Sequence, residues 1–160
     1  MGLFQGFDIS ASGMTAQRLR MDVISENIAN INTTRTKDSG EPYTRKIVQF
    51  QEKYLNPNSY KMGGLEVTSF EDHLRSYLKS YHGNGVRVRK VYEDRESEYK
   101  MDYDPSHPDA DENGYVTYPN VNTVTEMTNL IDASRSYQAN VTAFNAMKDI
   151  ATSGLSIGQA

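Results

Sequence analysis

The stretch FDISASGMTAQRLRMDVISENIANI, residues 7–31, decides the fold of this chain. Apolar side chains recur in it at every seventh position, and Ile24 and Ile31 add two on the alternate positions. A seven-residue apolar spacing is typical of a helix that packs against a second helix along a narrow seam. The seam residues that this pattern predicts are Phe7, Met14, Met21, Ile24 and Ile28.

The boundaries of this first helix follow from its flanking residues. Ser10 or Ser12 is a suitable N-terminal cap, because a serine oxygen accepts hydrogen bonds from the first free amides of a helix. The segment 25–34 is rich in asparagine and threonine, which are poor helix formers. We therefore expect the helix to end near Asn32.

A matching helix is predicted at the other end of the chain, after Pro119. Its seam residues are Met127, Leu130, Tyr137, Val141 and Phe144. If the two helices run antiparallel, we expect Phe144 to face Met21 or Ile24. Residues 1–34 and 119–160 then form one unit of paired terminal helices, and the coiled-coil-like hairpin gives the chain an α+β fold around a small β-rich middle. A plain helical core of a small domain is the alternative, since apolar stripes usually form a core.

The middle of the chain, residues 35–118, differs in composition. It holds most of the 17 basic and 21 acidic residues and nearly all of the 11 tyrosines. Alternating apolar and polar residues predict strands at 43–50 and 86–92, with shorter ones at 65–68, 99–103 and 115–118. A short helix is predicted over 69–81. Turns are indicated at the glycine-rich positions 63–64, 83–85 and 113–114.

Overall composition excludes several classes of protein. A net charge of −4 and a pI near 5.4 argue against a nucleic-acid-binding protein, which needs a basic surface. The chain has no cysteine, which excludes disulfides and thiolate metal sites. It also lacks an apolar run of membrane-spanning length. The first ten residues, MGLFQGFDIS, do not resemble a cleaved secretory signal.

The sequence offers little that is typical of catalysis. The three histidines are scattered, and no nucleophile or phosphate-binding motif is present, so we expect neither an enzyme nor a cofactor. Asp109–Gly114, DADENG, matches the first half of a calcium loop, but Asn120 replaces the glutamate expected at its twelfth position. A turn rich in Asp and Asn is the simpler interpretation. A calcium-stabilised cell-surface binding module is therefore kept as the alternative function.

Three runs of residues resemble a known family. The run GMTAQR at 13–18 followed by NIAN at 27–30, and the run EMTNLIDASRSYQANV at 126–141, resemble the terminal signatures of the bacterial flagellar rod, hook and hook-associated axial proteins. The central run YDPSHPDAD at 103–111, with GYV at 114–116, is more selective and is similar to a member of the proximal rod. The resemblance covers about 1–50 and 85–160. Residues 51–84 depart from it and are interpreted as an insertion.

The resemblance implies a structural role. A protein of this family forms an inner rod domain from its paired terminal helices. It assembles helically with itself and other rod proteins into a hollow drive shaft that transmits torque from the membrane ring to the hook. The implied partners also include membrane-ring and rod-junction proteins and the flagellar export apparatus. The implied location is the basal body in the periplasm and cell wall, reached by export from the cytoplasm without a cleaved signal.

Residues outside the predicted seam are candidates for contacts between subunits, because a helix with a second apolar stripe can bury it against a neighbour. The candidates are Val23, Asn27, Asn30, Ile131, Met147 and Ile150. The asparagines admit two interpretations: they bond neighbouring helices, or they mark a local helix end. The sequence alone favours neither.

Overall fold

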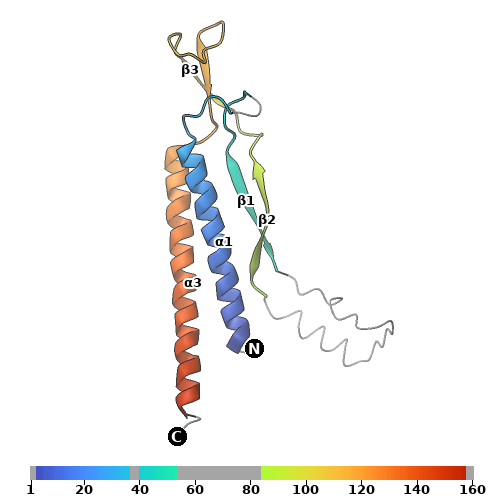
Figure 1. The fold of residues 1–160 in the computed structure, drawn as a ribbon, viewed down its shortest axis with the longest axis vertical. Coiled ribbons are helices and arrows are strands. Elements are labelled where there is room, and N and C mark those ends of the chain that lie inside the picture. Colours follow the sequence, from blue (N-terminus) through green and yellow to red (C-terminus); the bar gives the residue numbers. More distant parts are fainter. Residues whose placement is uncertain (1–2, 37–39, 54–83, 158–160) are drawn as a thin grey trace, which may run out of the picture.

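The computed structural model describes residues 3–36, 40–53 and 84–157. Two long helices, α1 (Leu3–Ala29) and α3 (Thr123–Ile157), lie side by side and antiparallel, so that both chain ends are at the same end of an elongated molecule (Figure 1). The strands between them form two small antiparallel sheets, which makes the fold α+β. The helix predicted over 69–81 and the strand predicted over 65–68 lie outside the described residues.

The first sheet is a two-stranded ribbon that runs along α1 (Figure 1). It pairs β1 (Lys46–Glu52) with β2 (Val86–Glu93), and its register shifts between Gln49 and Phe50. Both strands lie within a few residues of their predicted positions. Since α1 contacts both strands, one face of the ribbon is covered by the helix.

The second sheet is a hairpin at the far end of the molecule from the termini (Figure 1). It pairs β3 (Lys100–Tyr103) with β4 (Tyr115–Tyr118), and both strands lie where short strands were predicted. The predicted turn at 113–114 contains Gly114 with φ of +79°, a conformation that favours glycine.

The start of α1 differs from the prediction. The helix begins by Leu3 and ends at Ala29, so Ser10 and Ser12 lie inside it and do not cap it. Ser12 instead donates from its hydroxyl to the Ile9 carbonyl at 2.7 Å and accepts from the Val86 amide at 3.1 Å. Thus a serine that looked like a cap joins the helix to the first residue of β2.

The start of α3 is capped by Asn122 rather than fixed by Pro119. The Asn122 side-chain oxygen accepts hydrogen bonds from the amides of Val124 and Thr125 at 3.0 and 3.2 Å. These bonds satisfy amides that have no partner within the helix. Glu126 follows in the first turn, where the helix dipole favours a negative charge.

Candidate assembly interface

The seam between α1 and α3 includes two pairs in which a glycine of α1 faces a larger residue of α3, and one pair of polar residues. A side-chain carbon added to Gly6 would meet Met147, and one added to Gly13 would meet the Asn140 amide at 2.6 Å. Asn27 bonds Glu126 at the upper end. A move of seven residues toward the C-terminus of α1 therefore corresponds to a move of seven residues toward the N-terminus of α3. This register places Ala133, which is fully buried, opposite Arg20.

Most of the predicted seam residues are at least half-buried, and Ile24 is buried. Met127 is an exception, with 54% of its surface exposed, because its neighbour Glu126 occupies the facing position. The expected pairing of Phe144 with Met21 or Ile24 is wrong. Phe144 instead packs edge-on against Phe7, with ring centroids 4.9 Å apart. The residues of α3 that face α1 therefore include Glu126 and Asn140, each one position before the apolar residue that the pattern had marked. The apolar pattern could not indicate this shift, because both of these facing residues are polar.

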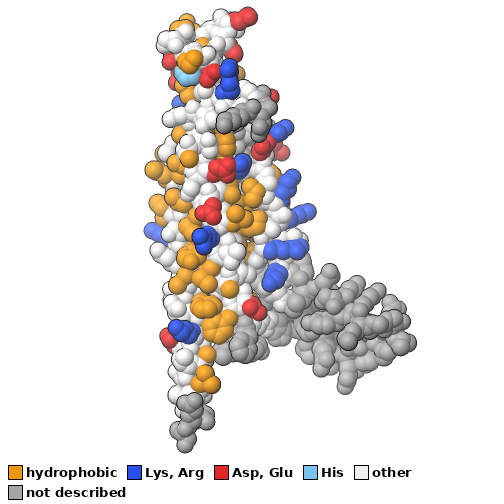
Figure 2. Space-filling view, viewed as in Figure 1, with side chains coloured by type: hydrophobic (Ala, Val, Ile, Leu, Met, Phe, Trp, Pro, Cys, Tyr) orange, Lys and Arg blue, Asp and Glu red, His pale blue; other side chains and the backbone are white. Residues whose placement is uncertain are grey.

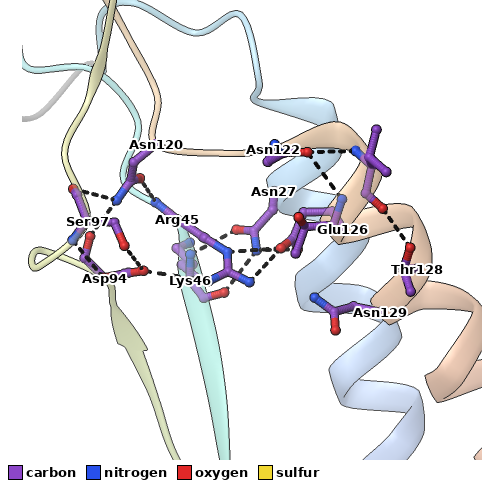
Figure 3. Close-up of polar contacts among 12 residues, drawn as sticks. Asn27, Arg45, Lys46, Asp94, Ser97, Asn120, Asn122, Glu126, Thr128 and Asn129 are labelled. Atoms are coloured by element: carbon purple, nitrogen blue, oxygen red, sulfur yellow. Dashed lines mark hydrogen bonds and ion pairs between the residues drawn. The ribbon is translucent and has the colours of Figure 1, made fainter.

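Asn27 is the centre of a buried polar junction between the helices and the ribbon (Figure 3). Its side-chain nitrogen donates to the Lys46 carbonyl at 2.9 Å and to Glu126 Oε2 at 3.1 Å. Its oxygen accepts from the Lys46 amide and from the Tyr43 hydroxyl, both at 2.9 Å. Both N–H donors and both acceptor sites of the Asn27 amide are therefore used. The two bonds to the Lys46 backbone, one donated and one accepted, resemble those that a neighbouring strand would make with the first residue of β1.

Glu126 carries a charge in this junction although only 1% of its surface is exposed. Arg45 donates to Glu126 Oε1 from Nε at 2.9 Å and from Nη2 at 2.7 Å. The other side of the guanidinium faces Asp94, with Nη1 3.6 Å from Oδ2. A buried carboxylate needs a paired cation and hydrogen bonds to both oxygens, and here it has both.

Asn120 joins the segment before α3 to two other parts of the chain. Its oxygen accepts from the Arg45 amide at 2.9 Å, and its nitrogen donates to the Asp94 carbonyl at 2.7 Å. Hydrogen bonds from the Ser97 hydroxyl and neighbouring amides, with smaller help from Arg45, lower the pKa of the Asp94 carboxyl. The junction therefore ties the two helices, the ribbon and the connection to the hairpin together at one level (Figure 3).

Tyr43 completes the junction from the segment that leads into β1. It is buried and donates to Asn27. Burial raises the pKa of its phenol above the ordinary value, and the negative charges of Glu26, Glu126 and Glu93 raise it further. The tyrosine is thus held as a neutral hydrogen-bond donor.

The first two turns of α3 carry exposed apolar residues on the side that points away from α1. Val124, Met127 and Ile131 lie there, since at about 100° per residue they fall on the side opposite the seam residues Glu126 and Ala133. Figure 2 shows hydrophobic side chains over much of the helical pair, whereas Lys and Arg side chains follow the ribbon side of the molecule. A row of exposed aliphatic residues on a helix is typical of a protein contact surface.

The predicted inter-subunit residues fall into three groups. Ile131 and Ile150 are exposed on α3 and available to a neighbour. Val23 and Asn27 are buried inside the subunit, and Met147 packs over Gly6, so these three serve the subunit's own packing. Asn30 donates to the Glu26 carbonyl at 2.9 Å, a local bond at the end of α1. The sequence analysis did not identify Arg45 and Glu126 as important residues. The one sequence feature that pointed to Glu126 was its position as a charged residue in a charge-poor helix.

The loop Asp109–Gly114 is held by bonds to the rest of the protein. The Asp109 carboxylate accepts from the Thr34 hydroxyl at 2.8 Å and pairs with Arg35 at 3.2 Å. The Gly114 amide donates to the Asp111 carbonyl at 2.8 Å, which closes a turn. Within the residues that the structure describes, no cluster of three or more acidic or histidine side chains is arranged to hold a metal. The loop thus links the hairpin to the segment that follows α1.

Comparison with known proteins agrees with this arrangement at both ends of the chain. A family model described as "Flagella basal body rod protein" matches residues 7–37, and one described as "Flagellar basal body rod FlgEFG protein C-terminal" matches residues 112–157. The chain is 45% identical to the flagellar basal-body rod protein FlgC of Borreliella burgdorferi over 99% of both chains. It belongs to the FlgC family.

Two further FlgC relatives show how far the similarity extends. That of Bacillus subtilis is 44% identical over 99% of this chain and 100% of its own. That of Salmonella typhimurium is 36% identical over 99% of this chain and 100% of its own. These relatives are named as rod proteins and not as enzymes. Among the described helices none is both long and apolar enough to cross a membrane.

Proposed function

We propose that this chain is a structural component of the flagellar basal-body rod. It assembles helically with copies of itself and other rod proteins into a hollow shaft that transmits torque from the membrane ring to the hook. The observation that carries this proposal is the antiparallel helix pair in which the first two turns of α3 expose apolar residues on the outer side. Full-length similarity to FlgC proteins supports it.

The helical pair is the part that packs into the rod. Its heptad register, in which Gly6, Gly13 and Asn27 face Met147, Asn140 and Glu126, supports a coiled-coil-like pairing. Residues 1–34 and 119–160 form the inner rod domain, and 35–118 form the β-rich part, with an insertion at 51–84. The exposed residues Ile131 and Ile150 contact neighbouring subunits.

The polar junction explains how such a subunit transmits torque. A torque applied to the helices reaches the ribbon only if the two parts cannot rotate against each other. Asn27, Arg45 and Glu126 connect them by directional bonds that are shielded from water. Directional bonds resist a twist that apolar contacts alone tolerate by sliding, so the junction acts as a rigid coupling.

Further elements of the proposal come from the family alone. The chain leaves the cytoplasm through the flagellar export apparatus without a cleaved signal and takes its place in the periplasm and cell wall. There it contacts membrane-ring and rod-junction proteins as well as other rod subunits.

The test is a charge on the outer face of α3. Ile131→Asp changes an exposed residue, so we expect the subunit to fold with a melting temperature close to that of the unchanged chain. Burying that carboxylate against a neighbour without a partner is costly, so rods should not form and cells should be non-motile. Gln49→Asp adds the same charge on an exposed position of β1 and should preserve motility. Normal rods containing the Ile131→Asp chain would refute the proposal.

A further inference from the structure

A groove lies between α1 and the ribbon, on the side of α1 away from the seam. It has a volume of about 510 Å³, and its apolar lining comes from Ala16, Leu19, Val86 and Val88. The two walls of the groove are joined by the hydrogen bond that the Val86 amide donates to the Ser12 hydroxyl. A side-chain carbon on the preceding Gly85, whose φ is +91°, would collide with that same hydroxyl.

The rim of the groove is mostly basic. Arg18, Lys53 and Arg87 line it, against the single carboxylate of Asp22. Figure 2 shows Lys and Arg side chains on this side of the molecule, over the ribbon. An apolar floor with a cationic rim suits a helix that presents aliphatic residues and a negative end.

The end of α3 has these properties. Because Met147 faces Gly6, the residues of α3 beyond about 150 extend past Leu3, where α1 begins (Figure 1). Ile150, Leu155 and Ile157 are 64, 68 and 78% exposed there. The last turn of α3 holds no basic residue, so the negative end of the helix dipole is not offset within the helix.

The dimensions also agree. At about 1.5 Å per residue, the overhang from Ile150 to Ile157 is about 12 Å long, and the groove along α1 from Ser12 to Asp22 is about 16 Å long. A copy of the chain shifted along the long axis by about 25 Å brings its α3 end to this level. Such a shift keeps α3 antiparallel to α1, as it is within one subunit.

We propose that the overhanging end of α3 of one subunit docks in the α1–ribbon groove of a second copy of this chain. Ile150 and Ile157, which are seven residues apart and so share one face of α3, fill the apolar floor, and the negative helix end lies near Arg18, Lys53 and Arg87. The contact is head-to-tail and uses different surfaces on the two copies, so it propagates and does not close into a dimer. The inference rests on the proposed rod function and gives it a specific contact.

Cysteine cross-linking tests this contact, because the chain has no cysteine of its own. Thr15 lines the groove and Ile157 lies on the overhang. In basal bodies purified from cells that make the Thr15→Cys, Ile157→Cys chain, mild oxidation should give disulfide-linked dimers and larger multimers of this chain. The two positions are about 28 Å apart within one subunit by helix geometry, too far for an internal disulfide. The control chain Glu98→Cys, Ile157→Cys, with its first cysteine exposed on the segment before β3, should give none.

A charge reversal on the rim provides a second measurement. In the double-cysteine background, Arg87→Glu should reduce the cross-linked fraction at least threefold. Arg89→Glu makes the same charge change on the same strand, outside the groove lining, and should leave the fraction unchanged. Cross-links to a different rod protein only, or equal effects of the two reversals, would overturn this inference. Rods that contain the chain but give no multimers would overturn it and leave the rod function standing, whereas basal bodies that lack the chain altogether would refute both.

Discussion

Replacing Asn27 by alanine tests the polar junction most directly. The substitution removes four hydrogen bonds, one of them to the carboxylate of Glu126. A neutral hydrogen bond contributes about 0.5–1.5 kcal/mol net, and one to a charged group about 1.5–3 kcal/mol. Allowing for water that enters the vacated space, we expect the free energy of unfolding to fall by about 3–5 kcal/mol. A domain with a total of about 5–15 kcal/mol would lose a large part of its stability.

The assay is urea unfolding of the purified full-length chain followed by circular dichroism, with Asn30→Ala as the matched control. Asn30 lies one helical turn away, and its nitrogen makes a local bond to Glu26. Its replacement should cost about 0.5–1 kcal/mol, as is usual for a partly exposed site. Equal losses for the two variants would refute the view that the junction stabilises the subunit. Losses for Asn27→Ala below about 1 kcal/mol would refute it as well.

An aspartate at position 27 separates charge from shape. Asn27→Asp keeps the size of the side chain but removes the nitrogen that donates to Glu126 and to the Lys46 carbonyl. Two carboxylates then face each other in a buried site, so at neutral pH we expect a larger loss than with alanine. Protonation relieves the repulsion, so the gap between this variant and Asn27→Ala should narrow as the pH falls toward 5.

Three further predictions concern glycines and a tyrosine. Gly13→Ala should lower the melting temperature, because the new carbon meets an amide on α3, whereas Gly154→Ala has open space and should be neutral or stabilising by up to about 1 kcal/mol; thermal scans in which both variants behave alike would contradict this. The raised pKa of Tyr43 means that the folded state keeps the phenolic proton where the unfolded chain has lost it, so its contribution is complete below about pH 10 and is lost as the pH rises above that value. Tyr43→Phe should make urea midpoints less dependent on pH above 10, and an unchanged slope would exclude this tyrosine as the cause. Gly114→Val should impair motility because φ there is +79°, whereas Asp111→Asn should be tolerated with and without a calcium chelator; a severe, chelator-sensitive defect in Asp111→Asn would count against a structural turn.

The sequence by itself determined the classes of the elements and the approximate positions of those that the structure describes. Apolar spacing of seven residues marked both terminal helices, and alternation with glycine turns marked the strands of the ribbon and the hairpin, because these patterns depend only on local backbone geometry. The terminal signatures also indicated the family, which the comparisons confirmed. These features are local in the chain, and one sequence displays them in full.

The tertiary structure decided how the helices face each other and what holds them to the ribbon. An apolar pattern marks Met127, yet Glu126 faces α1, because Arg45 arrives from 81 residues away in the chain to pair with its charge. Asn27 looked like a surface residue or a helix end, and its role depends on the backbone of Lys46 lying beside it. Burial of a polar residue becomes favourable only when distant partners satisfy it, and no local pattern reveals such partners.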